Sequence, residues 1–166
     1  IHFEQDEWDM LASSDTAIAS GPTSNAPIED FGLGSGLFDF EKAEDEGIRW
    51  ALGSDIGGGP YLCMFDVIDS FERQNRAAGK SGNHHIRALY RSTLAGAGIL
   101  GFGDHRGNLS VGKRLDCIQC TAKRGNEPDA TSASVLEAVL AQAPERGRFE
   151  DLVLSTVVNG KIIYEA

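Results

Sequence analysis

The chain has 166 residues, 41% of them hydrophobic and 24% charged, with a formal net charge of −10, which fits one domain or a piece of a larger one. The acidic balance argues against nucleic acid or an anionic membrane surface as partner, because both recruit clustered Lys and Arg. No apolar run reaches the roughly 18 residues of a membrane span. The acidic first residues also lack signal-peptide character.

Hydrophobic periodicity predicts that helices and short strands alternate in the first part of the chain. Apolar stripes at helical spacing, closed by Gly47 and Gly79, indicate helices, and brief apolar runs indicate buried strands. This alternation is typical of a parallel α/β structure. The expected elements are a helix at 3–12, a strand at 16–19, loops at 20–25 and 32–36, a helix at 38–46, a strand at 48–52, and helices at 63–78 and 86–100.

The last part of the chain changes character and predicts strands of a different sheet. Asn159-Gly160 between two β-branched runs is a strong hairpin signal. We therefore expect two units, at 1–106 and 107–166. The elements expected in the second unit are a turn-rich link at 107–113, a strand at 115–120, a loop at 121–131, a helix at 132–143 and hairpin strands at 154–158 and 161–164.

An acid follows the second predicted strand, in Leu52-Gly-Ser-Asp-Ile-Gly-Gly-Gly-Pro60. Parallel α/β barrels carry their reactive groups at the C-terminal ends of strands, so Asp55 is a candidate for metal binding or catalysis. The alternative is that it caps the following helix or shapes the turn. Ser24, Asn25 and Ser35 lie on another such loop and could bind a ligand or form turns. The glycines at 57–59 lack the Lys-Ser/Thr of a phosphate-binding loop.

The cysteines and histidines form no complete metal site in the sequence. An odd number of cysteines, three, fits a reducing cytoplasm better than a disulfide framework. Cys117 and Cys120 form a Cys-x-x-Cys on a predicted strand, and we expect buried cysteines on opposite faces rather than a zinc or redox site. We expect His84-His85 to be solvated and His105 to lie in a turn. No His-x-His pair occurs.

Four segments spread over nearly the whole chain carry a family resemblance. They are Ile1-His-Phe-Glu-Gln-Asp-Glu-Trp8; Pro22-Thr-Ser-Asn25 with Leu33-Gly-Ser-Gly-Leu-Phe38; Leu52-Gly-Ser-Asp-Ile-Gly-Gly-Gly59 with Met64 and Asp66; and Ala88-Leu-Tyr-Arg-Ser-Thr-Leu-Ala-Gly-Ala97 with Leu100-Gly-Phe-Gly103, Gly107-Asn-Leu109, Gly112-Lys113 and Val158-Asn-Gly-Lys161. On these residues the chain resembles the C-terminal part of the guanine deaminases, in the amidohydrolase superfamily.

The resemblance implies a zinc-dependent hydrolase that converts guanine to xanthine and ammonia. It implies the C-terminal part of a TIM-like (β/α)8 barrel, with strands of a small β-sandwich domain. Asp55 matches the eighth-strand acid, which in the family binds the metal and accepts a proton from the attacking water. The resemblance also implies a homodimer when the protein is complete.

The chain departs from the family pattern in its other metal ligands. The family's His-x-His pair, its fifth- and sixth-strand histidines and its general-acid Glu match no residue here, and Ser20-Gly21 replaces a common His-Cys. We therefore expect a C-terminal portion that is inactive on its own. Two alternatives stay open: an aminohydrolase of the same superfamily acting on another substrate, and a non-catalytic fragment that serves as an assembly or binding module.

Overall fold

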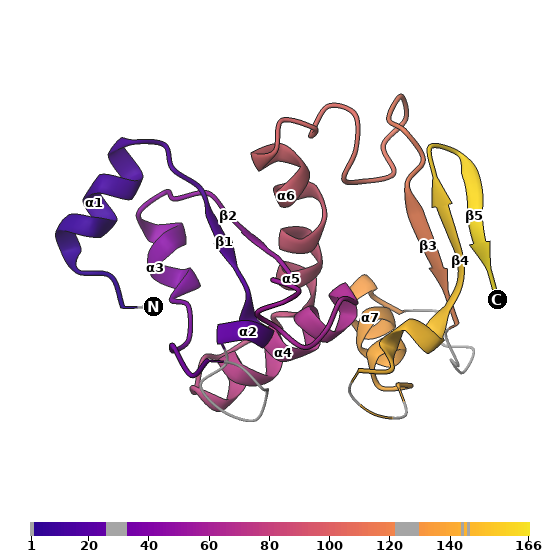
Figure 1. Cartoon of the computed structure of the whole chain (residues 1–166), viewed down its shortest axis with the longest axis horizontal. Helices are drawn as coiled ribbons and strands as arrows, with labels where there is room; N and C mark the ends of the chain where they lie inside the picture. Colours follow the sequence, from indigo (N-terminus) through magenta and orange to yellow (C-terminus); the bar gives the residue numbers. More distant parts are fainter. Residues whose placement is uncertain (1, 26–32, 122–129, 144, 146) are drawn as a thin grey trace.

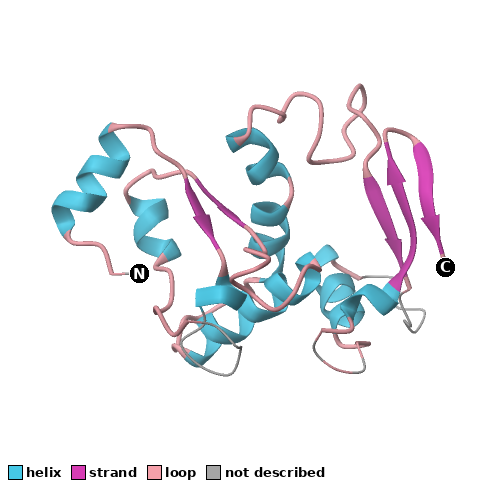
Figure 2. Ribbon diagram, in the orientation of Figure 1, coloured by secondary structure: helices cyan, strands magenta, loops and turns pink. Residues whose placement is uncertain are grey.

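The computed structural model describes residues 2–25, 33–121, 130–143, 145 and 147–166. These residues form a mixed α/β structure with two sheets (Figures 1 and 2). The first sheet has two parallel strands, and the second has three antiparallel strands. The described residues do not close a barrel. The boundary between units at 106 and 107 stays a prediction.

The helices and strands lie close to the ranges that the sequence predicts. Within the described ranges, no helix is long and apolar enough to cross a membrane. Of the expected loops, residue 32 and residues 122–129 lie outside the described residues. The elements are α1 Gln5–Ser13, β1 Ile18–Ser20, α2 Pro22–Asn25, α3 Phe40–Asp45, β2 Trp50–Leu52, α4 Met64–Ala77, α5 His85–Ser92, α6 Leu94–Ile99, β3 Cys117–Cys120, α7 Ser132–Leu140, the 3-10 helix η1 Phe149–Leu152, β4 Val153–Val158 and β5 Lys161–Glu165.

The parallel pair lies against an aromatic core. Strands β1 and β2 pair with Ala19 opposite Ala51, and all three residues of β2 are buried. Trp50 is fully buried, and its ring centroid lies 6.0 Å from that of Phe40 and 5.7 Å from that of Phe71. Helices α5 and α6 also contact β2. Strand β2 therefore packs against α3 and α4 through Trp50, and it also contacts α5 and α6.

Helix α4 confirms the clearest periodic pattern in the sequence. Phe65, Ile68 and Phe71 recur at helical spacing and are buried. The helix ends before Gly79, which has a φ of +80°, a conformation that glycine adopts at little cost. Helix α4 also contacts η1, which places it beside the C-terminal segment.

Two predictions about local structure are wrong. Residues 22–25, expected as loop, form the single turn α2, in which the amides of Ser24 and Asn25 donate to the carbonyl of Gly21. Pro22 starts this turn, as proline often does, because its φ is preset for a helix. The single helix expected at 86–100 is divided at Thr93 (φ −128°, ψ −92°), whose hydroxyl donates to the carbonyl of Leu89.

The second sheet contains the predicted hairpin. Strands β4 and β5 pair antiparallel around Asn159 and Gly160, whose φ values of +53° and +74° suit a tight hairpin turn. Strand β3 pairs with the other side of β4. All five residues of β5 are exposed. Figure 1 shows this sheet apart from β1 and β2, with α5 and α6 between them.

Candidate functional site

Asp55 lies in a turn just beyond the C-terminal end of β2. The amide of Gly53 still donates to the carbonyl of Ser20 on β1, at 2.9 Å, and the chain then leaves the sheet. Asp55 has a φ of +48°, and its carbonyl accepts from the amides of Gly58 and Gly59 at 2.9 and 2.7 Å. This turn fixes the backbone of Asp55 and leaves its side chain exposed.

Two glycines make room for the Asp55 side chain. A Cβ atom at Gly21, just beyond β1, would lie 3.2 Å from the Cβ of Asp55 and 2.6 Å from Ser24 Oγ. A Cβ atom at Gly58 would lie 2.8 Å from Asp55 Oδ2. The ends of the two parallel strands therefore meet at Asp55, as the barrel interpretation of the sequence expects for a reactive acid.

The polar residues of the neighbouring turn bind one another. Ser24 Oγ and Asn25 Nδ2 donate to the carbonyl of Gly21 at 3.0 and 3.1 Å, and Ser35 Oγ donates to Asn25 Oδ1 at 2.7 Å. These hydrogen bonds support the turn-forming interpretation of the three residues. The amides of Gly58 and Gly59 already donate to the backbone carbonyl of Asp55, so these two amides are not available to bind a phosphate.

His84 and His85 are buried, so the prediction that they are solvated is wrong. Their exposed fractions are 2% and 9%. The ring of His84 lies 5.3 Å from that of Phe40, and its amide donates to Glu72 Oε2 at 2.8 Å. The aromatic partner comes from α3, far along the chain, and local sequence could not show it. His105 lies in an exposed turn, as expected.

Cys117 and Cys120 are half-buried free thiols, less buried than predicted. Strand β3 lies at the edge of the sheet, and its pairing with β4 shifts between Gln119 and Cys120. Cys120 packs against the hydrophobic core. Neither cysteine belongs to a group of potential metal ligands among the residues that the structure describes.

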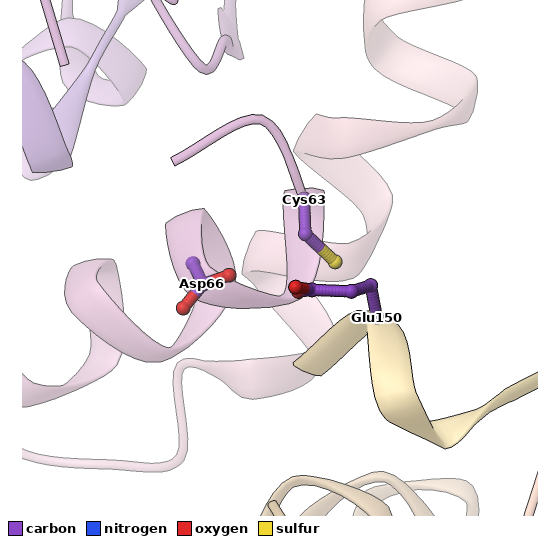
Figure 3. A group of neighbouring side chains, drawn as sticks. All are labelled: Cys63, Asp66 and Glu150. Carbon is purple, nitrogen blue, oxygen red and sulfur yellow. The ribbon is translucent and has the colours of Figure 1, made fainter. Parts of the chain in front are cut away.

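The structure brings together three potential ligands that the sequence did not mark as a site. Ligand atoms of Cys63, Asp66 and Glu150 all lie within 4.8 Å of one another (Figure 3). Cys63 and Asp66 lie at the start of α4, three residues apart, and Glu150 lies in η1. The spacing of the first two was visible in the sequence. The contact with Glu150 depends on the tertiary fold.

Comparison with known proteins gives the family. A model of the amidohydrolase family matches residues 1–163. The chain belongs to the amidohydrolase family. The guanine deaminase of Escherichia coli is 31% identical over 172 residues, which cover 99% of this chain and 36% of the relative. This amidohydrolase chain thus spans about a third of the length of that relative.

Solved structures give the same result. An E. coli guanine deaminase superposes with a TM-score of 0.81 at 28% identity, covering 99% of this chain and 37% of the other. The guanine deaminase of C. acetobutylicum, solved with guanine in its active site, has a TM-score of 0.77 at 25% identity, covering 99% of this chain and 38% of the other. The resemblance to the C-terminal part of guanine deaminases is confirmed.

A second group of amidohydrolases matches over the same length. The 5-methylthioadenosine/S-adenosylhomocysteine deaminase of Symbiobacterium thermophilum is 28% identical, over 99% of this chain and 36% of the relative. The chain is therefore a fragment of the amidohydrolase fold that is related both to guanine deaminases and to these adenosyl-type deaminases.

Proposed function

We propose that this chain is part of a zinc-dependent hydrolase that deaminates guanine to xanthine and ammonia. The observation that carries the proposal is the position of Asp55 at the end of β2, in a chain that is similar to guanine deaminases along its whole length. In this proposal β1 and β2 are the seventh and eighth strands of a (β/α)8 barrel. Strands β3, β4 and β5 belong to a small β-sandwich, with the boundary near 106.

The Asp55 carboxylate fits the role of a metal ligand. The side chain is exposed, and no described residue donates a hydrogen bond to it or forms an ion pair with it. Its oxygens can therefore bind a cation, and carboxylate oxygens are ordinary zinc ligands. Gly21 and Gly58 leave the space that the carboxylate occupies. The other ligands would come from parts of the protein that match nothing in this chain.

Asp55 would act at a carboxylate oxygen as the acceptor of a proton from the attacking water. A bound zinc ion lowers the pKa of its water to about 7, which brings that proton within reach of a carboxylate. The backbone turn holds Asp55 through the hydrogen bonds from Gly58 and Gly59 to its carbonyl. The backbone of the acid thus keeps a defined position although its side chain is exposed, and positioning of this kind supports proton transfer.

Substrate turnover by the complete protein tests the proposal. Ammonia release is measured with guanine and with 5-methylthioadenosine, because deaminases for both classes match the chain. We expect kcat/KM for guanine to exceed that for 5-methylthioadenosine by at least about tenfold. A preference for 5-methylthioadenosine would establish the second candidate instead. No turnover of either, in a protein with zinc bound, would favour the non-catalytic module.

Two further expectations belong to this proposal. The complete protein forms a homodimer, as the resemblance to guanine deaminases implies, and it works in the cytoplasm. Light scattering of the purified protein measures the oligomeric state, and fractionation of the source cells locates it. A strict monomer that is fully active would remove the first expectation and leave the chemistry of Asp55 unaffected.

A further inference from the structure

Three side chains that can bind a metal lie close together where the start of α4 meets the 3-10 helix η1. Figure 3 shows Cys63 and Asp66 projecting from the start of α4 and Glu150 reaching towards both from η1. A ligand atom of each lies within 4.8 Å of the other two. The three residues also line an open cavity of about 440 Å³, together with Pro60, Tyr61, Leu62 and Gly147. Solvent ions can reach the group through this cavity.

One carboxylate oxygen of Asp66 has no hydrogen-bond partner. The residue is 3% exposed, and the amide of Gly147 donates to its Oδ1 at 2.7 Å. Its Oδ2 is buried and has no hydrogen-bond partner. A buried acceptor without a hydrogen-bond partner is destabilising, and more so when it is charged. The hydrogen bond to Gly147 therefore satisfies half of the carboxylate, and the other half lacks a partner.

No positive side chain among the described residues is paired with the carboxylates of this group. Within the described ranges, neither Asp66 nor Glu150 forms an ion pair with Lys, Arg or His. Burial and the negative charge of Glu150 raise the pKa of Asp66, against the lowering effect of the Gly147 amide. Burial and the negative charge of Asp66 raise the pKa of the Cys63 thiol. Among the described residues, this acidic group therefore lacks a positive partner.

We propose that Cys63, Asp66 and Glu150 form a binding site for a divalent cation that accepts both sulfur and oxygen ligands, of which Zn²⁺ is the example. The thiol argues against Mg²⁺ and Ca²⁺, which prefer oxygen ligands alone. Zinc binds thiolate at about 2.3 Å and carboxylate at about 2.0–2.2 Å, so ligand atoms around it lie roughly 3.3–3.8 Å apart. Glu150 is exposed, so a change of its side-chain rotamer can close the remaining gap.

The cation acts as a link between two distant parts of the chain. Gly147 already joins the segment before η1 to Asp66 through its amide. A cation held by Cys63, Asp66 and Glu150 adds a second connection between the start of α4 and η1. Because the three residues line the open cavity, water could complete the coordination of such a cation. Asp55 is not among these ligands, so the site does not depend on the proposed function.

Cobalt titration tests the proposal, because Co²⁺ replaces Zn²⁺ and its thiolate complexes absorb in the near ultraviolet. The complete protein is stripped with a chelator and titrated with Co²⁺. We expect one equivalent of a cysteine-dependent absorption band, which disappears on addition of Zn²⁺. The Cys63→Ser variant should lose the band, whereas Cys117→Ser, which removes another half-buried free thiol, should keep it.

The carboxylates are tested by affinity. Asp66→Asn and Glu150→Gln should each weaken Zn²⁺ binding by at least about tenfold, because even residues that only support a metal ligand contribute that much. Asp69→Asn, one turn further along α4, is the matched control and should change binding little. Circular dichroism shows that each variant is folded. Asp55→Ala should leave the cysteine-dependent band unchanged, so failure here and failure of the proposed function are distinguishable.

Three outcomes would overturn the proposal. One is a band that survives in Cys63→Ser. Another is Zn²⁺ affinity that is equal in wild type, Asp66→Asn and Glu150→Gln. The third is an adventitious ion only: a metal that dialysis removes completely and that binds with no defined stoichiometry. Each outcome contradicts a site built from these three residues.

Discussion

Asp55 and Asp66 are close in sequence and opposite in environment. Asp55 is exposed, lies in the left-handed region at φ +48°, and receives hydrogen bonds only at its backbone carbonyl. Asp66 is 3% exposed, lies in the regular first turn of α4, and has a partner for only one of its two oxygens. Asp55 is strained in its backbone, whereas the carboxylate of Asp66 is destabilised by the loss of hydration on burial. Substitutions at the two positions should therefore differ in what they change.

The largest effect is expected from Asp55→Ala in the complete protein. Loss of a metal ligand and proton acceptor should lower kcat/KM by about 10²- to 10⁴-fold, the usual contribution of general acid–base catalysis. Ammonia release measures the activity, and elemental analysis of the same samples measures the bound zinc. Asp104→Ala, which removes another exposed acid, is the control. Equal zinc content and equal turnover in wild type and Asp55→Ala would refute the assignment.

Asp55 was identifiable from the sequence because its evidence is local. A short apolar run, Ile48 to Leu52, ends directly before a glycine-rich turn, and this pattern alone placed the acid at a strand end. The structure places it there, beside the end of β1. Helix α4 and the Asn159-Gly160 hairpin were also predictable, since their periodicity and turn residues lie within the elements themselves.

The parts that the sequence did not predict depend on distant contacts. His84 is buried because Phe40 and Phe71, from other helices, pack around it. The division between α5 and α6 at Thr93 lets α6 approach β2, where a Cβ atom on Gly96 would lie 3.8 Å from that of Ala51. Glu150 lies near Asp66 through a contact between segments that are distant in the chain. The periodicity of apolar residues does not predict contacts between segments that are distant in the chain.

Gly21→Ala should test whether the space beside Asp55 is essential. A Cβ atom there would lie 2.6 Å from Ser24 Oγ and 3.2 Å from the Cβ of Asp55, so the turn must shift. We expect the free energy of unfolding to fall by about 1–3 kcal/mol, as for other overpacked sites. Urea unfolding measures it. Gly53→Ala, where a new Cβ meets nothing within 4 Å, should cost less, and an equal cost in both variants would contradict this argument.

Asp66→Asn should raise stability in the metal-free protein. The pKa of Asp66 is raised in the folded state, chiefly by burial, so folding favours the protonated form. This contribution is fully present below the usual carboxyl pKa of 3.8 and is lost as pH rises through the raised pKa. Asparagine keeps an oxygen for the Gly147 amide and does not titrate. We therefore expect a gain of about 1 kcal/mol at neutral pH.

Urea unfolding at several pH values measures the effect of Asp66→Asn. The difference between the variant and wild type should vanish at low pH and grow as pH rises. With saturating Zn²⁺ the sign should reverse, since wild type then gains the bound cation and the variant binds it weakly. Asp69→Asn is the control on the same helix. A variant that is less stable than wild type at every pH, with and without zinc, would show that Asp66 has its partner already.

The smallest effect is expected from Asp55→Gly. A non-glycine residue in the left-handed region is strained, and glycine adopts it freely, so this substitution should raise stability by about 0.5–1 kcal/mol. Ser54→Gly, at a neighbouring position without a positive φ, should instead lower it by a similar amount. In the complete protein Asp55→Gly should be as inactive as Asp55→Ala.

A gain of stability together with a loss of turnover would mean that the strain at Asp55 is retained for its carboxylate. A loss of stability equal to that of Ser54→Gly would mean that the acid supports the turn, and the contrast with Asp66 would then fail.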